Sequence, residues 1–255
     1  MTEAVLDVSD LEAGYEPGAP IVRGASITVN KGEIVVVLGP NGAGKSSLIK
    51  AIAGLVPISR GKVLLDGKDI TTAPAHTMVR LGLAFVPQTE NVFPRMSVED
   101  NLKVSCGILE RRQAPARLDE MYAAFPDLLR QRRTPAGNLS GGQRQMLAVA
   151  RALIVHPKVL VLDEPSAGLS PKFVSMVFEM LSAIRKSDVT ILLVEQNAKA
   201  ALTVGDRAYV LVEGKERHEG VASTLWNDPV VAELYLGQRP SHKGGARRTE
   251  AGGAA

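Results

Sequence analysis

The sequence predicts an α/β fold in which a mainly parallel core sheet is interrupted by an all-helical segment. Residues 34–38 form a β-branched apolar run without alternation, which is typical of a strand covered on both faces. Similar apolar runs return at 159–162, 190–194 and 208–212. Between these groups of strands, from residue 89 to about residue 152, the pattern is helical.

The elements before the helical segment can be assigned in order. A strand-like opening from residue 4 is followed by a turn-rich stretch at 14–18, and a second strand candidate covers 25–29. The strand at 33–38 runs into a glycine-rich loop and then a helix that stops at Gly54. Residues 62–70 indicate a hairpin whose turn is Asp66-Gly67.

The helical segment begins with a capping pattern at residues 97–100, where Ser97 can accept a hydrogen bond from the first helical turn. We expect one domain over residues 1–238, in which a helical subdomain at about 89–152 is inserted between core segments. A disordered basic tail is expected over residues 239–255, which are rich in Gly and Ala.

Composition limits the class of protein. With 255 residues, 45% hydrophobic and 22% charged, the chain suits one large globular domain. Its single cysteine cannot form an internal disulfide, and its acidic N-terminus differs from a signal peptide. No apolar run approaches the roughly 18 residues that a membrane-spanning helix needs. We therefore expect a soluble protein that serves a membrane, if at all, by docking.

The net charge of +3 comes from the C-terminal end of the chain. Residues 239–255 contain four basic side chains and Glu250, whereas the rest of the chain has equal numbers of basic and acidic residues. Aromatic residues make up only 4% of the chain, which argues against a surface that stacks on bases. No nucleic-acid partner is expected.

The glycine-rich loop matches the pattern G-x-x-x-x-G-K-[ST], with a strand before it and a helix after it. Backbone N–H groups of such a loop surround phosphates, and the helix N-terminus adds about half a positive charge. Lys45 would contact the β and γ phosphates, and the Ser46 hydroxyl would ligate Mg²⁺. The loop consists of Gly39, Pro40, Asn41, Gly42, Ala43, Gly44, Lys45 and Ser46.

Two carboxylates, Asp163 and Glu164, end the strand that begins at residue 159. Ligand groups gather at the carboxyl ends of strands in open α/β sheets. Asp163 would hold the metal directly or through water, and Glu164 would orient or polarise an attacking water. Alone, the pair would be an acidic cap of the next helix; downstream of a phosphate loop, the catalytic interpretation is favoured.

The segment Leu139-Ser140-Gly141-Gly142-Gln143 precedes a helix that begins near residue 144. With this signature between a phosphate loop and an acidic pair, the chain resembles the ATP-binding-cassette ATPases up to about residue 237. The resemblance implies a P-loop NTPase core sheet of the RecA-like kind, an antiparallel β subdomain and an inserted all-helical subdomain. It also implies that the signature of one subunit closes over the ATP that the phosphate loop of a second subunit holds. The signature and the phosphate loop each lie at a helix N-terminus, which suits a phosphate anion. Two chains are therefore needed for a complete site.

The resemblance assigns further residues to the nucleotide site. Tyr15 stands where an aromatic ring stacks on adenine, and packing against the neighbouring strand is the alternative. Gln88 matches a glutamine that senses the metal and γ phosphate and couples them to a transporter subunit, and Ser47 matches a second phosphate-contacting hydroxyl. The implied cofactors are ATP and Mg²⁺, with Ser46, Gln88 and Asp163 as the metal-binding residues.

Two positions depart from the general pattern of the family. Gln196 occupies the place of a switch histidine; as a catalytic residue it can hydrogen-bond the γ phosphate, but it cannot titrate. More of the chemistry therefore falls on Glu164. Ser170 stands where an aspartate is frequent, which puts the usual contact between facing nucleotide sites in doubt.

Residues 92–95, 168–171, 194–197 and 233–237 together resemble the LivF-type ATPases of branched-chain amino-acid importers. In that group glutamine is usual at the position of Gln196, so this residue does not indicate an inactive enzyme. Closely related ATPases energise urea and short-chain amide importers, and the sequence does not separate the two substrates.

The resemblance implies an ATP-hydrolysing subunit on the cytoplasmic face of the inner, or plasma, membrane. The implied partners are a second cassette ATPase that is a paralogue, two transmembrane permease subunits and a substrate-binding protein. One alternative is a soluble cassette ATPase of DNA repair, chromatin or translation, but the coiled coil or second cassette of such proteins is missing. Another is a switch that binds nucleotide without turnover, and Glu164 speaks against it.

Several other residues carry weaker expectations. Val92, Phe93 and Met96 would line the groove that receives a permease segment in the family, and plain core packing is the alternative. Trp226 is expected to pack onto the core. Cys106 is expected to be a small buried apolar residue.

Overall fold

The computed structural model describes residues 4–185, 187 and 189–231, and these contain two sheets. The central sheet has the strand order β10-β9-β3-β8-β7-β6. Its strands are β3 (Ile34–Leu38), β6 (Leu83–Val86), β7 (Val159–Asp163), β8 (Thr190–Val194), β9 (Arg207–Val212) and β10 (Lys215–Val221). The second sheet is β2 (Val22–Asn30), β1 (Ala4–Ala13), β4 (Ile58–Leu65) and β5 (Lys68–Asp69), in that spatial order.

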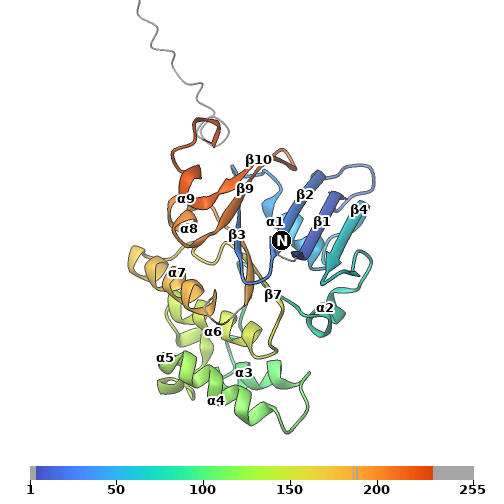
Figure 1. The fold of residues 1–255 in the computed structure, drawn as a ribbon. Coiled ribbons are helices and arrows are strands. Elements are labelled where there is room, and N and C mark those ends of the chain that lie inside the picture. Colours follow the sequence, from blue (N-terminus) through green and yellow to red (C-terminus); the bar gives the residue numbers. More distant parts are fainter. Residues whose placement is uncertain (1–3, 186, 188, 232–255) are drawn as a thin grey trace, which may run out of the picture.

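The helices pack around these sheets (Figure 1). They are α1 (Lys45–Ile52), α2 (Ala75–Leu81), α3 (Val98–Cys106), α4 (Ala114–Ala124), α5 (Pro126–Arg130), α6 (Gly141–Leu153), α7 (Pro171–Arg185), α8 (Ala198–Val204) and α9 (Ala222–Leu225), with a 3₁₀ turn at Ala136–Asn138. The expected α/β fold with an antiparallel subdomain and a helical subdomain is confirmed.

The central strands are buried on both faces, as their unbroken apolar runs predict. All five residues of β3 are buried, and the same holds for β7 and β8. Alternate side chains of β3 enter two separate cores: Ile34 and Val36 face one, and Val35 and Val37 face the other. The first core includes the apolar sides of α6 and α7, and the second includes α1 and the antiparallel sheet.

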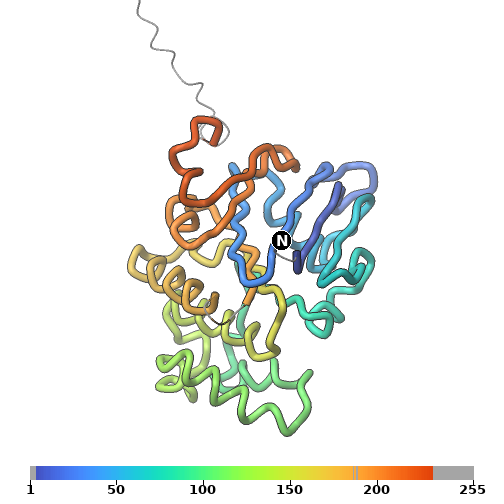
Figure 2. The backbone as a smooth tube through the Cα atoms, in the orientation of Figure 1, coloured from blue at the N-terminus to red at the C-terminus, as the bar shows by residue number. Residues whose placement is uncertain are grey.

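The helical segment is inserted between two strands that are neighbours in the sheet. β6 and β7 pair in parallel, with Leu83 opposite Val159, although the whole helical segment separates them in sequence. The tube in Figure 2 shows the chain leaving the sheet after β6 and returning at β7. Ser97 caps α3 as predicted, because its hydroxyl oxygen accepts a hydrogen bond from the backbone N–H of Asp100 at 3.0 Å.

The antiparallel sheet contains the predicted hairpin. Asp66 and Gly67 have φ angles of 53° and 73°, the backbone of a two-residue turn with positive φ at both positions. The sequence indicates that the first strand of this hairpin begins at residue 62, whereas in the structure it begins at Ile58.

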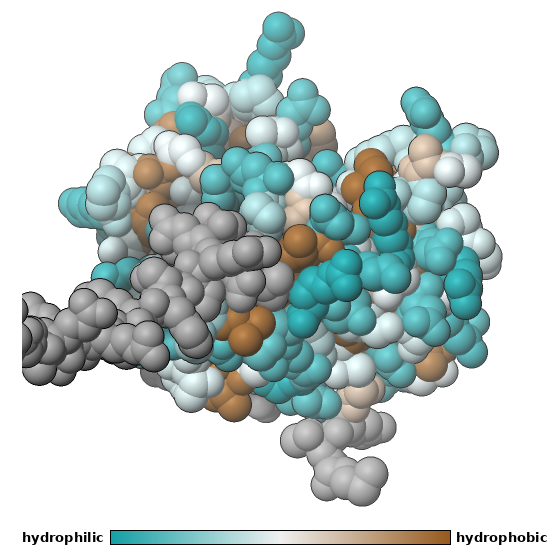
Figure 3. Space-filling model, turned by 90° about the horizontal axis from the view of Figure 1, so that it is seen from above, coloured by the Kyte–Doolittle hydropathy of each residue, from teal (hydrophilic) through white to brown (hydrophobic). Residues whose placement is uncertain are grey.

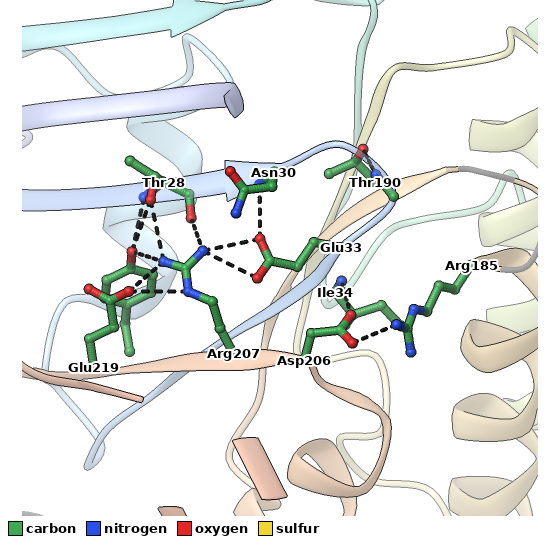
Figure 4. Close-up of polar contacts among 11 residues, drawn as sticks. Thr28, Asn30, Glu33, Ile34, Arg185, Thr190, Asp206, Arg207 and Glu219 are labelled. Carbon is green, nitrogen blue, oxygen red and sulfur yellow. Dashed lines mark hydrogen bonds and ion pairs between the residues drawn. The ribbon is translucent and has the colours of Figure 1, made fainter. Parts of the chain in front are cut away.

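A polar network joins the antiparallel sheet to the central sheet (Figure 4). The guanidinium of Arg207, at the start of β9, donates to both carboxylate oxygens of Glu33 at 3.1 and 3.2 Å and to the hydroxyl of Tyr209 at 2.6 Å. The same guanidinium reaches the carbonyl oxygen of Thr28 on β2 at 3.4 Å. Glu33 also accepts from the backbone N–H of Asn30 at 2.9 Å. The network therefore fixes the junction between β2 and β3 against β9.

The burial of two side chains contradicts one expectation and confirms another. Trp226 is 53% exposed, because α9 turns Ala222 and Leu225 inward and leaves the following residue outside. Cys106 is buried, as expected. On the face shown in Figure 3, hydrophilic side chains predominate and hydrophobic ones form small separate groups. The predicted tail at 239–255 and the segment 233–237 lie outside the described residues.

Candidate functional site

The phosphate loop lies between β3 and α1, at the carboxyl end of a central strand. Gly39 must be glycine there, because a Cβ at this position would lie 2.2 Å from the carbonyl oxygen of Leu211. The turn between β9 and β10 supports the loop from the other side, since the N–H of Gly214 donates to the carbonyl oxygen of Ala43 at 2.9 Å. This support comes from residues that sequence reasoning did not select.

Lys45 occupies the centre of the loop and is only 5% exposed. Its ammonium donates to the carbonyl oxygens of Gly39 at 2.9 Å and Pro40 at 3.2 Å, and lies 3.9 Å from the Glu164 carboxylate. Burial lowers the pKa of Lys45, while the negative charges of Glu164 and Asp163 raise it. The site thus holds the Lys45 ammonium among oxygen atoms, where it can form an ion pair with a phosphate group.

The hydroxyl of Ser46 and the carboxylate of Asp163 meet across the site, with a hydrogen bond of 2.8 Å from Oγ to Oδ1. Asp163 is the last residue of β7 and is 3% exposed. Burial raises the pKa of its carboxyl group, and the hydrogen bond from Ser46 opposes that shift. A hydroxyl and a carboxylate so close together are the oxygen donors that Mg²⁺ prefers, so these residues fit the metal that the sequence predicts.

Glu164 follows directly and accepts a hydrogen bond from the side-chain amide of Gln88 at 2.8 Å. Gln88 comes two residues after β6, so the acid and the amide stand at the ends of neighbouring strands. Glu164 has a φ of 44°, an uncommon backbone conformation for a residue with a side chain. The structure therefore brings Lys45, Ser46, Gln88, Asp163 and Glu164 together, as the sequence predicts.

The signature residues form the N-terminus of α6. Ser140 caps the helix by accepting from the N–H of Gln143 at 3.3 Å, and the Gln143 side chain accepts from the N–H of Ser140 at 3.0 Å. Gly142 has no room for a side chain, since a Cβ would lie 2.3 Å from Cδ1 of Phe173. In the described part of the chain, no hydrogen bond or ion pair joins these residues to the phosphate loop.

The remaining predicted residues lie around the loop. Tyr15 is 58% exposed in the connection between β1 and β2, so its ring is not packed into the core. Ser47 is half-buried in the first turn of α1, and Gln196 is exposed just after β8. Ser170 is exposed before α7, and its carbonyl oxygen accepts from the N–H groups of that helix's first turn.

Sequence reasoning also passed over Glu195, a buried carboxylate next to Gln196. The sequence does contain a signal for this residue, because Glu195 is a charged residue directly after a strand that is apolar except for Thr190.

A groove of about 380 Å³ opens between the end of β6, α3 and α6. Its lining includes Phe85, Pro87, Val104, Ile108 and Arg151. Val104 and Ile108 are each 46% exposed although they are apolar.

Residues after Gln88 form one border of this groove. The guanidinium of Arg151 lies 4.6 Å from the centre of the Phe93 ring and donates to the carbonyl oxygen of Asn91 at 2.6 Å. Its Nε is buried and has no hydrogen-bond partner among the described residues. Val92 packs against the core, Phe93 is 43% exposed, and neither they nor Met96 are among the residues that line this groove.

Known proteins are similar to this chain in sequence and in fold. A family model described as ABC transporter matches residues 22–167. A probable branched-chain amino acid transport ATP-binding protein, LivF, of Archaeoglobus fulgidus is 43% identical over 89% of this chain and 96% of its own length. The high-affinity branched-chain amino acid transport ATP-binding protein BraG of Pseudomonas aeruginosa is 40% identical over 83% of this chain and 91% of its own.

Among solved structures, the ADP conformation of an ATP-binding cassette from an ABC transporter superposes with a TM-score of 0.81. The two sequences are 28% identical, and the match covers 93% of this chain and all of the solved one. Within the part of the chain that the structure describes, no helix is both long and apolar enough to cross a membrane.

Proposed function

Because the chain belongs to the ABC transporter family, we propose that it is the ATP-hydrolysing subunit of an importer for branched-chain amino acids. The observation that carries this proposal is the site in which Glu164 pairs with Lys45 and accepts a hydrogen bond from Gln88, while Ser46 donates to the neighbouring Asp163. The substrate class is supported by the names of two relatives that align with most of the chain.

The phosphate loop binds the nucleotide. Its backbone N–H groups and the N-terminus of α1 attract the phosphates, and the Lys45 ammonium adds a positive charge at the β and γ groups. Ser47 supplies a second hydroxyl to the phosphates, and the exposed ring of Tyr15 is available to stack on adenine.

Ser46, Asp163 and the side-chain oxygen of Gln88 would hold Mg²⁺, which neutralises charge on the phosphates when bound. Glu164 orients and polarises the attacking water, and its backbone at the end of β7 fixes the carboxylate beside Lys45. Gln196 contributes a hydrogen bond to the γ phosphate without a titrating proton.

The complete site needs two cassettes. Residues 139–143 of one subunit close over the ATP on the phosphate loop of the other, since the capped N-terminus of α6 is a second anion site. We expect the second cassette to be a paralogue, working with two permease subunits and a substrate-binding protein. The chain would then lie on the cytoplasmic face of the plasma membrane, with the groove at Val104 and Ile108 against a permease segment.

The hydrolytic role is tested by Glu164→Gln in the assembled transporter. Steady-state ATP hydrolysis should fall by about 10²- to 10⁴-fold, because the amide cannot accept a proton from the attacking water. ATP should remain bound in a closed dimer, measured by nucleotide retention after gel filtration. Asp10→Asn, on an exposed acid of the antiparallel sheet, serves as the control with unchanged turnover. Unchanged turnover of Glu164→Gln would refute the assignment of the catalytic base.

The substrate is tested by uptake in a strain that lacks this protein. Radiolabelled leucine uptake should be lost and then restored by the wild-type chain, but not by Glu164→Gln. Labelled urea serves as the comparison, because related ATPases energise urea and amide importers. Loss of urea uptake with normal leucine uptake would replace the amino-acid assignment with the amide one.

A further inference from the structure

The carboxylate of Glu195 is buried beside the site and has no part in the function proposed above. Glu195 follows β8 directly and is 1% exposed. Its Oε1 accepts from the N–H of Ser166 at 2.9 Å. Its Oε2 accepts from the Ser166 hydroxyl at 3.0 Å and from the N–H groups of Gln196 and Asn197 at 3.2 and 3.4 Å. Four donors therefore converge on one side chain.

These hydrogen bonds join two loops that leave neighbouring strands. β7 and β8 pair up to Asp163 and Val194, and the N–H of Glu164 donates to the carbonyl oxygen of Val194 at 2.9 Å. Beyond this point, Ser166 belongs to the loop that carries Glu164, and the other two donors belong to the loop that carries Gln196. The Glu195 carboxylate thus links the loops of both residues to which we assign catalytic roles.

The loop after β7 requires such support. The positive φ of Glu164 is unfavourable for a residue with a side chain and persists only where the surrounding structure fixes it. The two bonds from Ser166 to Glu195 hold the chain two residues further along. In the loop after β8, the N–H groups of Gln196 and Asn197 donate to the Glu195 carboxylate. These hydrogen bonds fix the backbone position of Gln196.

Resting on the proposed ATPase function, we propose that Glu195 is a positioning residue for hydrolysis, holding the Glu164 loop and the Gln196 loop in one arrangement around the γ phosphate. Its contribution depends on the carboxylate. An amide of the same shape has one acceptor oxygen, and its NH₂ group would face either the Ser166 N–H or the donors at Oε2. Burial raises the pKa of Glu195, and the hydrogen bonds from Ser166 lower it, so the donors stabilise the charged form.

The test is Glu195→Gln in the assembled transporter, with ATP hydrolysis, ATP affinity and thermal unfolding measured together. We expect kcat to fall by about 10- to 100-fold, the loss that a small misplacement of reacting groups produces. KM and the Kd for ATP should change by less than about threefold, because the phosphate loop is untouched. An unchanged kcat, or an equal change in kcat and ATP affinity, would overturn the proposal.

The matched control is Glu33→Gln, which alters another carboxylate that accepts a backbone N–H but lies in the network around Arg207. Its side chain is 10% exposed, and it should lower thermal stability without lowering kcat. If Glu33→Gln reduces kcat as much as Glu195→Gln does, Glu195 acts only through general stability and the proposal fails.

A second variant keeps the test independent of folding. Ser166→Ala removes the hydroxyl donor and leaves the N–H, so we expect a smaller fall in kcat and no further fall when it is combined with Glu195→Gln. Wild-type kcat in Ser166→Ala would refute the linkage, and so would a loss in the double variant equal to the product of the two single fold-losses. Absence of hydrolysis in the wild-type transporter would instead refute the ATPase function itself, so the two failures are distinguishable.

Discussion

Single residues at the site are fixed by contacts with segments that are distant in the sequence. The turn at Gly214 supports the phosphate loop, and Ser46 bonds to Asp163 at the end of another strand. The motifs predicted Ser46 and Asp163 because both belong to short recognisable patterns. Gly214 and Glu195 escaped prediction because their contacts depend on how separate loops approach, and no local pattern records that.

Gly142 illustrates how little space one residue can have. Gly142→Ala should destabilise the isolated chain by about 1 to 3 kcal/mol, because the new Cβ would lie 2.3 Å from the Phe173 ring. Denaturant unfolding monitored by circular dichroism measures the change. Gly107→Ala is the control: its φ of −60° suits alanine, so stability should be unchanged or slightly higher. Equal stability of the two variants would contradict this packing argument.

At the scale of elements, apolar periodicity predicted most strands and helices, because their burial follows directly from it. Strands β3, β7 and β8 are buried on both faces and read as unbroken apolar runs. The pattern failed where burial is irregular: in β4 the half-buried Ile58 is followed by four exposed residues, and Trp226 lies just past the end of a one-turn helix. Polar residues and residues at the ends of elements do not take part in the apolar periodicity, so their burial and the bounds of their elements could not be predicted from it.

Two helices with serine caps allow a comparison of structural and functional roles. Ser97 caps α3 and Ser140 caps α6, each by accepting a backbone N–H from its own first turn. Replacing either serine by alanine should cost about 1 kcal/mol of unfolding free energy. Only Ser140→Ala should also lower ATP hydrolysis by the transporter, since only that hydroxyl belongs to the signature. A similar loss of hydrolysis in Ser97→Ala would show that the effect comes from helix stability alone.

At the scale of the whole molecule, we propose the groove between β6, α3 and α6 as the surface that contacts a permease segment. We predict that Val104→Glu abolishes co-purification with the permeases, because it places a charge among the groove's apolar residues. The control is Leu55→Glu, since Leu55 is similarly exposed at 51% but follows α1, and it should leave co-purification intact. Retention of the permeases by Val104→Glu, or their loss in both variants, would refute this docking surface.

The insertion of the helical segment between adjacent strands gives the molecule a mechanical property. The segment leaves the sheet after Val86, which pairs with Leu162 near the carboxyl end of β7, and returns at Val159, which pairs with Leu83 at the opposite edge of the sheet. Only the exit lies at the edge that carries Gln88 and Glu164, which are hydrogen-bonded to each other. A load applied to the outer helices therefore reaches the pair of Gln88 and Glu164 directly through the backbone that follows Gln88, whereas the full length of β7 separates the point of return from Glu164.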